Sequence, residues 1–453
     1  MIHETVTPKS ISLKHQIAIY SLTVWVAVMT GRVVAGNWES KFPIVFPDSS
    51  SFIKVANFGP LSIDFWFGER PLLTPLLLWL VGGGIREFVL AQTLLYFAAT
   101  AILIYVLMRI LHSNLSRIIA FVCIISIAIQ SRYSLWNLLL LSESLGMSTA
   151  LISIAAWLWY SHVQTKKSMT LAWVATATWM LARDSNTAVT VFLVLSGLLA
   201  LVCLKGRDSK NVISKYRIGL AAVLIVGCFA YLGQNISGRN DNPVMNNIGQ
   251  RVLTNPQMLD WYESHGMPVN EALLERTGKS AFDDQWKMLV EPELEEFRSW
   301  SRESGQFRQL ISFIRFAPHW IQESFQDLEG KLGYDYHDYD QFKVADKLPD
   351  GSWNGLGGPQ SQFAALIWLI LAMGSISLIW RDKNRIRAIV LSVLLLSCSI
   401  DYIVSWVGDS VEVNRHLVGC FFRTSIILAV VVACGANTKL SKSRTRTGRY
   451  ATP

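Results

Sequence analysis

The chain has 453 residues, of which 51% are hydrophobic and only 16% are charged, and its formal net charge is +8. Soluble domains rarely combine so many apolar residues with so few charged ones, so the composition excludes an ordinary soluble protein. The basic residues lie in short loops beside long apolar runs, where they orient membrane helices, and this excludes nucleic acid as a partner. The six cysteines lie in or at the ends of apolar runs without a CxxC pair, so they predict neither a metal site nor a disulfide framework.

We predict ten membrane-spanning helices from the apolar runs of the sequence. The predicted spans are 16–35, 86–109, 117–131, 142–162, 169–182, 186–204, 216–233, 362–380, 387–407 and 416–434. The first is too long for the core of a signal peptide, so we expect an uncleaved anchor. The segment 71–80 is apolar but short, and three glycines follow it. We expect this segment to lie at the outer membrane interface and not to cross.

Lysine and arginine residues concentrate in alternate loops, and these loops lie on the cytoplasmic side when the amino terminus is placed inside the cell. The chain is therefore predicted to be an all-α, polytopic integral membrane protein. Its predicted parts are a transmembrane core at 1–233 with a first outer loop at 36–85, an extracytoplasmic helical domain at 234–361, C-terminal transmembrane helices at 362–434 and a basic cytoplasmic tail at 435–453. In the outer domain, Asn255-Pro256 predicts a helix start, and helices are expected at 281–300 and 306–325.

The ionisable residues that could carry chemistry all fall on the predicted outer side of the membrane. They are Asp48, Asp64, Glu69, Arg70, Glu143, Arg183, Asp184, Arg415 and His416. Several of them also have a purely structural interpretation. Asp48 precedes three serines and could cap a helix, and Glu143 could head a span and interact with its dipole. The pair Arg183-Asp184 could be a local ion pair, and the pair Arg415-His416 could anchor a helix at the membrane interface.

The first outer loop carries a short motif. Asp48, Phe52 and Ala56 fit the pattern D-x-x-x-[YF]-x-x-x-A, and Arg70 then precedes a segment with prolines at 71 and 75. In this motif and in its layout the chain resembles the GT-C superfamily of membrane glycosyltransferases, especially the bacterial branch that uses polyprenyl-phosphate sugars. The layout covers most of the spans, whereas the motif is short and moderately specific, and 234–361 resembles no family that we can name.

Other residues extend the resemblance. Glu143 looks like the acidic residue that this family places at the head of the fourth span, and the pairs at 183–184 and 415–416 stand where its members often have polar groups.

The resemblance implies an inverting transfer of a sugar from a polyprenyl-phosphate donor to a lipid or glycan acceptor, at the outer face of a bacterial inner membrane. It implies catalytic roles for Asp48, as general base, and for Glu143. The residues implied for the donor phosphate are Arg183 and Arg415, with Arg70 and His416 in reserve, and those implied for orienting the substrates are Glu69, Asp64 and Asp184. Polyprenyl phosphate leaves readily, so no cofactor is expected, although a divalent metal stays open.

Two other functions stay open. A flippase or transporter of lipid-linked saccharides should show repeat symmetry and polar groups near the middle of its spans, where Asp401 is the main carboxylate in this sequence. A polymerase or ligase of lipid-linked glycans often has a large late outer loop, as this chain has. The polar residues of this sequence concentrate at the outer ends of the spans, which favours the enzyme over a transporter. Polymerases and ligases do not need a carboxylate directly after the first span, so Asp48 favours the transferase over them. The expected partners are the donor, the acceptor and membrane lipids.

Overall fold

A computed structural model describes residues 45–191, 194, 207–239, 241–332, 359–382 and 385–447. Over these residues the chain is helical and contains no strand, which confirms the all-α prediction. The predicted spans at 16–35 and, for the most part, at 186–204 lie outside the described residues.

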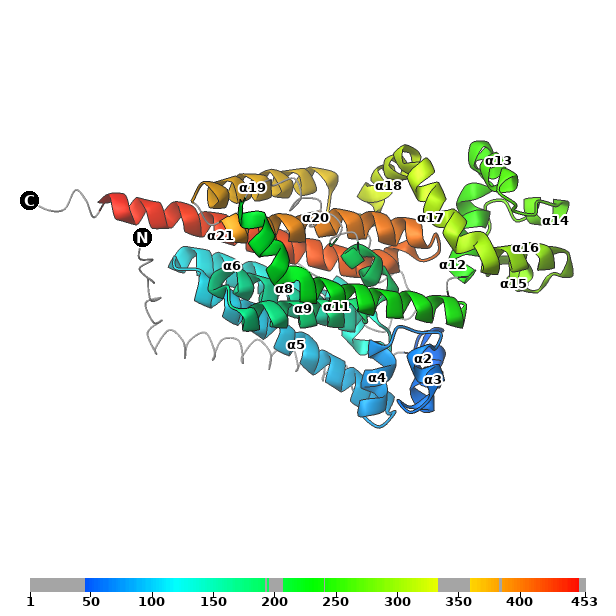
Figure 1. Cartoon of the computed structure of the whole chain (residues 1–453), viewed down its shortest axis with the longest axis horizontal. Helices are drawn as coiled ribbons and strands as arrows, with labels where there is room; N and C mark the ends of the chain where they lie inside the picture. Colours follow the sequence, from blue (N-terminus) through cyan, green and yellow to red (C-terminus); the bar gives the residue numbers. More distant parts are fainter. Residues whose placement is uncertain are drawn as a thin grey trace, which may run out of the picture.

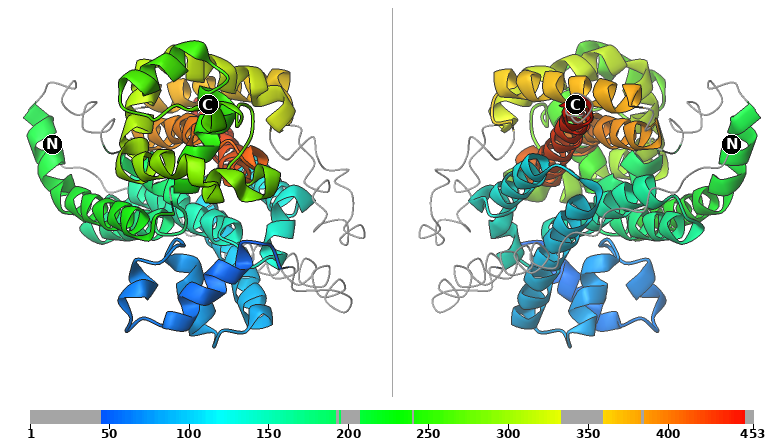
Figure 2. Two further views of the ribbon diagram at one scale, coloured as in Figure 1. Left: turned by 90° about the vertical axis from the view of Figure 1, so that its right-hand side faces the viewer. Right: turned by 90° about the vertical axis from the view of Figure 1, so that its left-hand side faces the viewer.

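The membrane part is a bundle of long helices with roughly parallel axes (Figure 1). Its members are α5 (Ile85–Ile110), α6 (Asn114–Ala128), α8 (Glu143–Val163), α9 (Lys166–Met180), α11 (Arg207–Ser237), α19 (Gln362–Arg381), α20 (Arg385–Gly408) and α21 (Val413–Thr447). The helix α21 packs against α6, α8, α19 and α20, and Figure 2 shows it end-on among its neighbours. Of the apolar stretch of α21, 83% is buried inside the protein, against 17% for α19. The helix α21 is therefore the core of the bundle, and α19 lies at its lipid-facing edge.

Five described helices are long and apolar enough to cross a membrane, namely α5, α11, α19, α20 and α21. The helix α6 and the short segment Arg132–Leu138 after it, bent by 60°, would together make a sixth. The predicted spans at 142–162 and 169–182 also form helices, α8 and α9, beside these. The integral membrane class is thus supported, and the count of ten spans stays a prediction.

The segment predicted as the first outer loop forms three short helices at one end of the bundle, which we call the outer end. They are α2 (Ser49–Phe58), α3 (Ile63–Trp66) and α4 (Leu73–Leu80). The helix α4 ends where Gly82 and Gly83 adopt φ of 83° and 80°, a left-handed conformation that glycine accepts without strain. The amide of Gly83 donates to the carbonyl of Leu78 (2.9 Å), which closes the helix before the chain enters α5. The segment 71–80 is thus a short separate helix.

The segment predicted as an extracytoplasmic domain lies beyond the same end of the bundle (Figure 1), and we call it the outer domain. Its helices are α12 (Asp241–Asn247), α13 (Pro256–Ser264), α14 (Glu271–Leu274), α15 (Asp283–Val290), α16 (Glu295–Trp300), α17 (Gln306–Arg315) and α18 (Ala317–Leu332). Asn255 caps α13, since its side chain accepts from the amides of Gln257 and Met258, which confirms the predicted start.

The prediction of single helices at 281–300 and 306–325 is wrong, because prolines interrupt both. Pro292 has no amide hydrogen to donate and separates α15 from α16, and Pro318 stands in the first turn of α18 just after the break at Phe316. The helix α21 contains the predicted span at 416–434 and continues through the basic sequence to Thr447.

The predicted orientation can be tested with a membrane-impermeant maleimide on intact cells. Thr254 is exposed on the outer domain, and Lys167 is exposed in the first turn of α9 at the opposite end of the bundle. We expect Thr254→Cys to be labelled in intact cells and Lys167→Cys only after permeabilisation. The unsubstituted chain, with its own cysteines, gives the background. The reverse pattern would place the outer domain in the cytoplasm.

Candidate functional site

The carboxylate of Asp48 lies at the outer end of the bundle, directly before α2. It makes no capping hydrogen bond to that helix. Its Oδ1 accepts from Nη2 of Arg70 at 2.8 Å, and its Oδ2 accepts from Nη1 of Arg415 at 2.9 Å. The capping interpretation therefore fails, and both oxygens are held by guanidinium groups whose geometry suits anionic oxygen atoms.

Short local contacts hold Asp48 in place. The buried hydroxyl of Ser49 donates to the carbonyl of Leu140 (3.0 Å) and accepts from the amide of Phe46 (2.9 Å), so the turn is tied to the segment that leads into α8. The guanidinium of Arg415 stands 5.2 Å from the ring centre of Phe46, and that of Arg70 stands 5.0 Å from the ring centre of Phe52. These aromatic faces confine the two cations that bind Asp48.

Arg415 is the centre of the site. Its Nη1 lies 2.9 Å from Oδ2 of Asp48 and 3.1 Å from Oε2 of Glu412, and its Nε lies 3.7 Å from Oε1 of Glu143. The side chain of Arg415 is only 10% exposed. A guanidinium removed from water to this extent needs compensation by anions, and three carboxylates from three separate segments provide it.

Glu143 connects this set of contacts to Arg183, which follows α9, and Arg183 in turn contacts His416 on α21. Its Oε1 lies 3.5 Å from Nη2 of Arg183, whose Nη2 lies 3.3 Å from Nδ1 of His416. The side chain of Glu143 is 3% exposed, and its Oε2 has no hydrogen-bond partner among the described residues. Asp48, Arg70, Glu143, Arg183, Glu412, Arg415 and His416 thus form one continuous set of contacts, which we call the outer charge network.

Two glycines make room for Arg183. A Cβ atom at Gly146 would stand 3.1 Å from Cδ of Arg183, and one at Gly419 would stand 3.4 Å from its Nη1. The side chain therefore extends between α8 and α21 because neither helix carries a side chain at these points.

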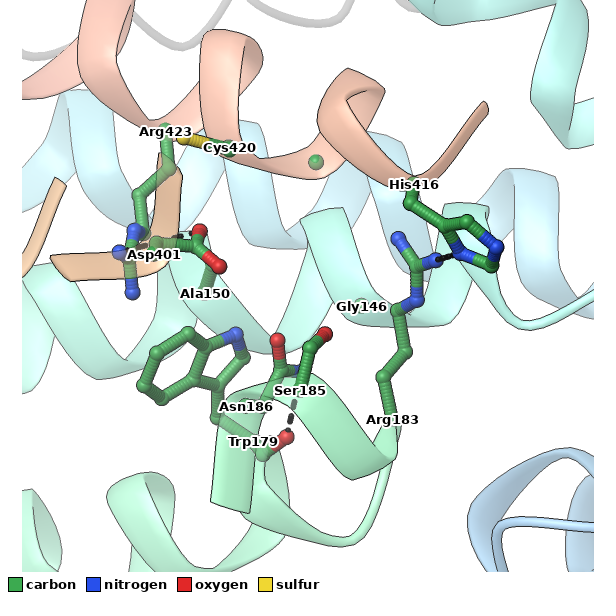
Figure 3. Close-up of a pocket in the computed structure, with 11 residues that line it drawn as sticks. Gly146, Ala150, Trp179, Arg183, Ser185, Asn186, Asp401, His416, Cys420 and Arg423 are labelled. Carbon is green, nitrogen blue, oxygen red and sulfur yellow. Dashed lines mark hydrogen bonds and ion pairs between the residues drawn. The ribbon is translucent and has the colours of Figure 1, made fainter. Parts of the chain in front are cut away.

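A small cavity, with room for about one water molecule, lies beside Arg183 and His416 inside the bundle (Figure 3). Its walls include Trp179 and Asn186 as well as the small residues Gly146, Ala150 and Gly419. At its inner side lies a second ion pair, in which Nη2 of Arg423 is 3.1 Å from Oδ2 of Asp401. The guanidinium of Arg423 stands 4.5 Å from the ring centre of Trp179. The outer charge network and this buried pair thus face one polar cavity.

The two carboxyl groups that share Nη1 of Arg415 have pKa values shifted in opposite directions. Burial acts to raise the pKa of Asp48, but the guanidiniums of Arg415 and Arg70 outweigh it and lower this pKa below 3.8. Burial raises the pKa of Glu412 above 4.5 in spite of Arg415, and the charges of Asp48 and Glu143 add to the rise. Glu412 also has a φ of 51°, a left-handed conformation that costs a residue with a side chain about 1–3 kcal/mol.

Three predicted site residues lie outside the network. Glu69 pairs with Lys54 at 3.0 Å on the surface, and Asp64 is exposed in the first turn of α3. Asp184 points away from Arg183 and pairs with Arg239 at 2.8 Å. The structure therefore gathers six of the nine predicted residues, and the substrate-orienting group is not among them.

Sequence reasoning missed Glu412, Asp409 and Arg239 as members of the site region. Glu412 stands three residues before Arg415, a spacing that favours an ion pair at a helix start, so a signal for it was present. Asp409 lies 3.8 Å from Nε2 of His416 and accepts from Nδ2 of Asn246, which ties the outer domain to the network. Arg239 has no such signal, because its partner comes from a distant segment. No group of three or more His, Cys, Asp or Glu residues suited to a metal ion occurs in the described residues.

One comparison with known proteins gives a match. The family model described as the YfdI N-terminal transmembrane domain matches residues 53–253. This match supports the conclusion that the chain is an integral membrane protein. The match contains Arg70, Glu143 and Arg183, whereas Asp48, Glu412, Arg415 and His416 lie outside it. No curated protein and no solved structure matches the chain.

The ion pairs of Asp48 predict a pH dependence of stability. The pKa of Asp48 is lower in the folded protein than in the unfolded chain, so its contribution is complete above about pH 5 and is lost as the pH falls below about 4. We expect Asp48→Asn to lower the free energy of unfolding by about 2 kcal/mol at pH 7. The difference in Tm between wild type and variant should shrink below about pH 4.

The measurement is thermal unfolding of the purified chain in detergent between pH 3.5 and 8. Glu69→Gln is the matched control, because Glu69 is a carboxylate of the same segment whose surface ion pair contributes little. A difference between wild type and Asp48→Asn that grows as the pH falls would contradict the assignment of Asp48 as an ionised partner.

Proposed function

We propose that this chain is an inverting glycosyltransferase of the GT-C type, which moves a sugar from a polyprenyl-phosphate donor to a hydroxyl group of a lipid or glycan acceptor. The observation that carries the proposal is that Asp48 contacts Arg70 and Arg415 at one end of the bundle, where Glu143 joins Arg183 to them. A carboxylate beside several guanidinium groups combines a proton acceptor with a binding site for phosphate. The proposal includes ten spans in a bacterial inner membrane, with this end facing the periplasm.

The proposed reaction is a single displacement. The acceptor hydroxyl gives its proton to the carboxylate of Asp48 while its oxygen forms a bond to the anomeric carbon. The bond from that carbon to the phosphate oxygen breaks on the opposite face, and its electron pair leaves with polyprenyl phosphate. The configuration at the anomeric carbon is therefore inverted. The guanidinium groups stabilise the negative charge that grows on the phosphate oxygen.

Donor binding and base strength are linked in this site. Without a donor, Arg70 and Arg415 hold both oxygens of Asp48 and lower its pKa, which makes the carboxylate a weak base. Three guanidiniums face three carboxylates in the network, so an arriving phosphate must compete with carboxylates for its cations. A phosphate that takes Arg415 and Arg70 removes the contacts of Asp48 and returns its pKa toward the ordinary value. Asp48 becomes an effective base when the donor is in place.

Glu143 and His416 support the cations in this proposal. One oxygen of Glu143 lies near both Arg183 and Arg415, so this buried carboxylate fixes the spacing of the two guanidiniums. Its other oxygen is buried and has no hydrogen-bond partner among the described residues. Nη2 of Arg183 lies 3.3 Å from Nδ1 of His416, and this contact orients the guanidinium beside the cavity.

The role of Asp48 is tested by Asp48→Asn, which keeps the shape of the side chain and removes the base. We expect transfer in proteoliposomes supplied with a polyprenyl-phosphate sugar and an acceptor to fall by at least about 10²-fold, with normal membrane insertion. Glu69→Gln should keep activity near that of the wild type. Activity retained by Asp48→Asn would remove Asp48 from the role of base.

The role of Arg415 is tested by Arg415→Ala. We expect donor binding to weaken by about 10²-fold, with a smaller effect on the acceptor, because only the donor brings an anionic phosphate. The matched control is Arg302→Ala, since Arg302 is an exposed cation of the outer domain outside the network. Titration with polyprenyl phosphate and with acceptor separates the two affinities. An equal loss for both substrates would assign Arg415 a structural role.

A flippase or transporter of lipid-linked saccharides is favoured by one observation, the Asp401–Arg423 pair buried between α20 and α21 beside the cavity. Charged residues inside membrane helices often line a transport path. The Asp48→Asn variant distinguishes the two functions. A flippase would continue to move lipid-linked saccharide across the membrane of the proteoliposome in this variant, whereas the transferase would lose its reaction.

A further inference from the structure

A second group of cationic side chains lies at the end of the bundle opposite the outer charge network. Arg387 stands in the first turn of α20, His162 in the last turn of α8, His112 in the connection from α5 to α6, and Arg117 in the first turn of α6. Nη2 of Arg387 lies 3.4 Å from Nδ1 of His162. Four separate elements thus bring nitrogen groups together, and we call this set the inner basic cluster.

Arg387 is buried without a counter-ion. It is 9% exposed, it forms no ion pair with a carboxylate in the part of the chain that the structure describes, and its Nε has no hydrogen-bond partner there. A buried guanidinium without an anion is strongly unfavourable, because it loses its hydration without compensation. The helix dipoles at the carboxyl-terminal ends of α5 and α8 offset only part of this cost.

The surroundings of the cluster are electropositive. Partial burial lowers the pKa of His112, and the guanidiniums of Arg387 and Arg117 lower it further. A proton on His112 is therefore disfavoured by its cationic neighbours, and an anion that bound among these groups would be stabilised by them.

The scaffold around the cluster is fixed. Oδ1 of Asn437 on α21 accepts from the amides of His112 (2.7 Å) and Ser113 (2.9 Å). Nε of Arg117 donates to the carbonyl of Leu111 (2.8 Å). These bonds tie the α5–α6 connection to the central helix and hold the groups in place before any ligand arrives, which reduces the entropy that binding costs.

Exposed apolar side chains adjoin the cations on the same helices. Leu115 and Ile118 flank Arg117 on α6 and are 54% and 59% exposed, and Ile389 follows Arg387 on α20 and is 40% exposed. A ligand with an anionic head and an apolar body matches this combination better than a small soluble anion does. The positive-inside distribution also assigns this end to the cytoplasmic leaflet, where anionic lipids bind basic pockets between helices.

We propose that the inner basic cluster binds the phosphate group of an anionic phospholipid in the cytoplasmic leaflet. Arg387 and Arg117 bind the phosphate oxygens, His112 and His162 donate hydrogen bonds to them, and Leu115, Ile118 and Ile389 contact the acyl chains. This binding does not depend on the proposed transferase activity.

The test is native mass spectrometry of the full chain in detergent, titrated with phosphatidylglycerol, with phosphatidylcholine and with inorganic phosphate. We expect phosphatidylglycerol to bind at least about 10-fold more tightly than phosphatidylcholine, and inorganic phosphate at millimolar concentration not to displace it. Arg387→Ala should remove this preference, and Arg387→Lys should keep part of it.

Two further variants keep the test decisive if Arg387→Ala does not fold. His112→Gln changes an exposed side chain and should weaken phosphatidylglycerol binding several-fold, whereas Arg381→Ala removes an exposed cation at the end of α19 and should not. Equal binding of both lipids, or an undiminished preference in His112→Gln and in the folded Arg387 variants, would overturn the proposal. If inorganic phosphate displaced phosphatidylglycerol, the cluster would be a site for free phosphate and not for a lipid, and the proposal would be wrong.

Discussion

The arrangement of the outer end of the bundle depends on one buried cation, the guanidinium of Arg415. It contacts Asp48 from the first outer segment, Glu143 from the start of α8 and Glu412 from the turn before α21. Because an isolated buried charge is costly, these carboxylates and the cation stabilise one another's positions. Segments more than 360 residues apart, as in the hydrogen bond from Arg415 to Asp48, are thereby held in one place.

The balance of charges in this network also explains how a substrate could act on it. Arg70, Arg183 and Arg415 are matched by Asp48, Glu143 and Glu412, so the site is electrically balanced before a ligand arrives. A phosphate can enter only by taking guanidinium groups from carboxylates, and the pKa of a carboxylate rises when it loses them. The deeper pair of Asp401 and Arg423 is already matched and lines the cavity without such competition.

The sequence predicted much of this fold and part of the site. Long apolar runs identify α5, α19 and α20 with nearly the observed bounds, and the alternation of basic loops placed Asp48 and Arg415 on one side. Which acid meets which base was not predictable. Arg183 and Asp184 are adjacent in the chain but point to different partners, Glu143 and Arg239, because consecutive residues at a helix start face different directions. Such pairings are decided by how the helices pack in three dimensions, and this packing cannot be read from a single sequence.

The most direct test of the account is a cryo-electron microscopy structure of the full chain in a lipid nanodisc with bound polyprenyl phosphate. The account predicts that the phosphate lies within hydrogen-bond distance of Arg415 and at least one of Arg70 and Arg183, with Asp48 released from Arg415 and facing the space for the acceptor. A phosphate bound away from these guanidiniums, with the pair of Asp48 and Arg415 intact, would contradict it.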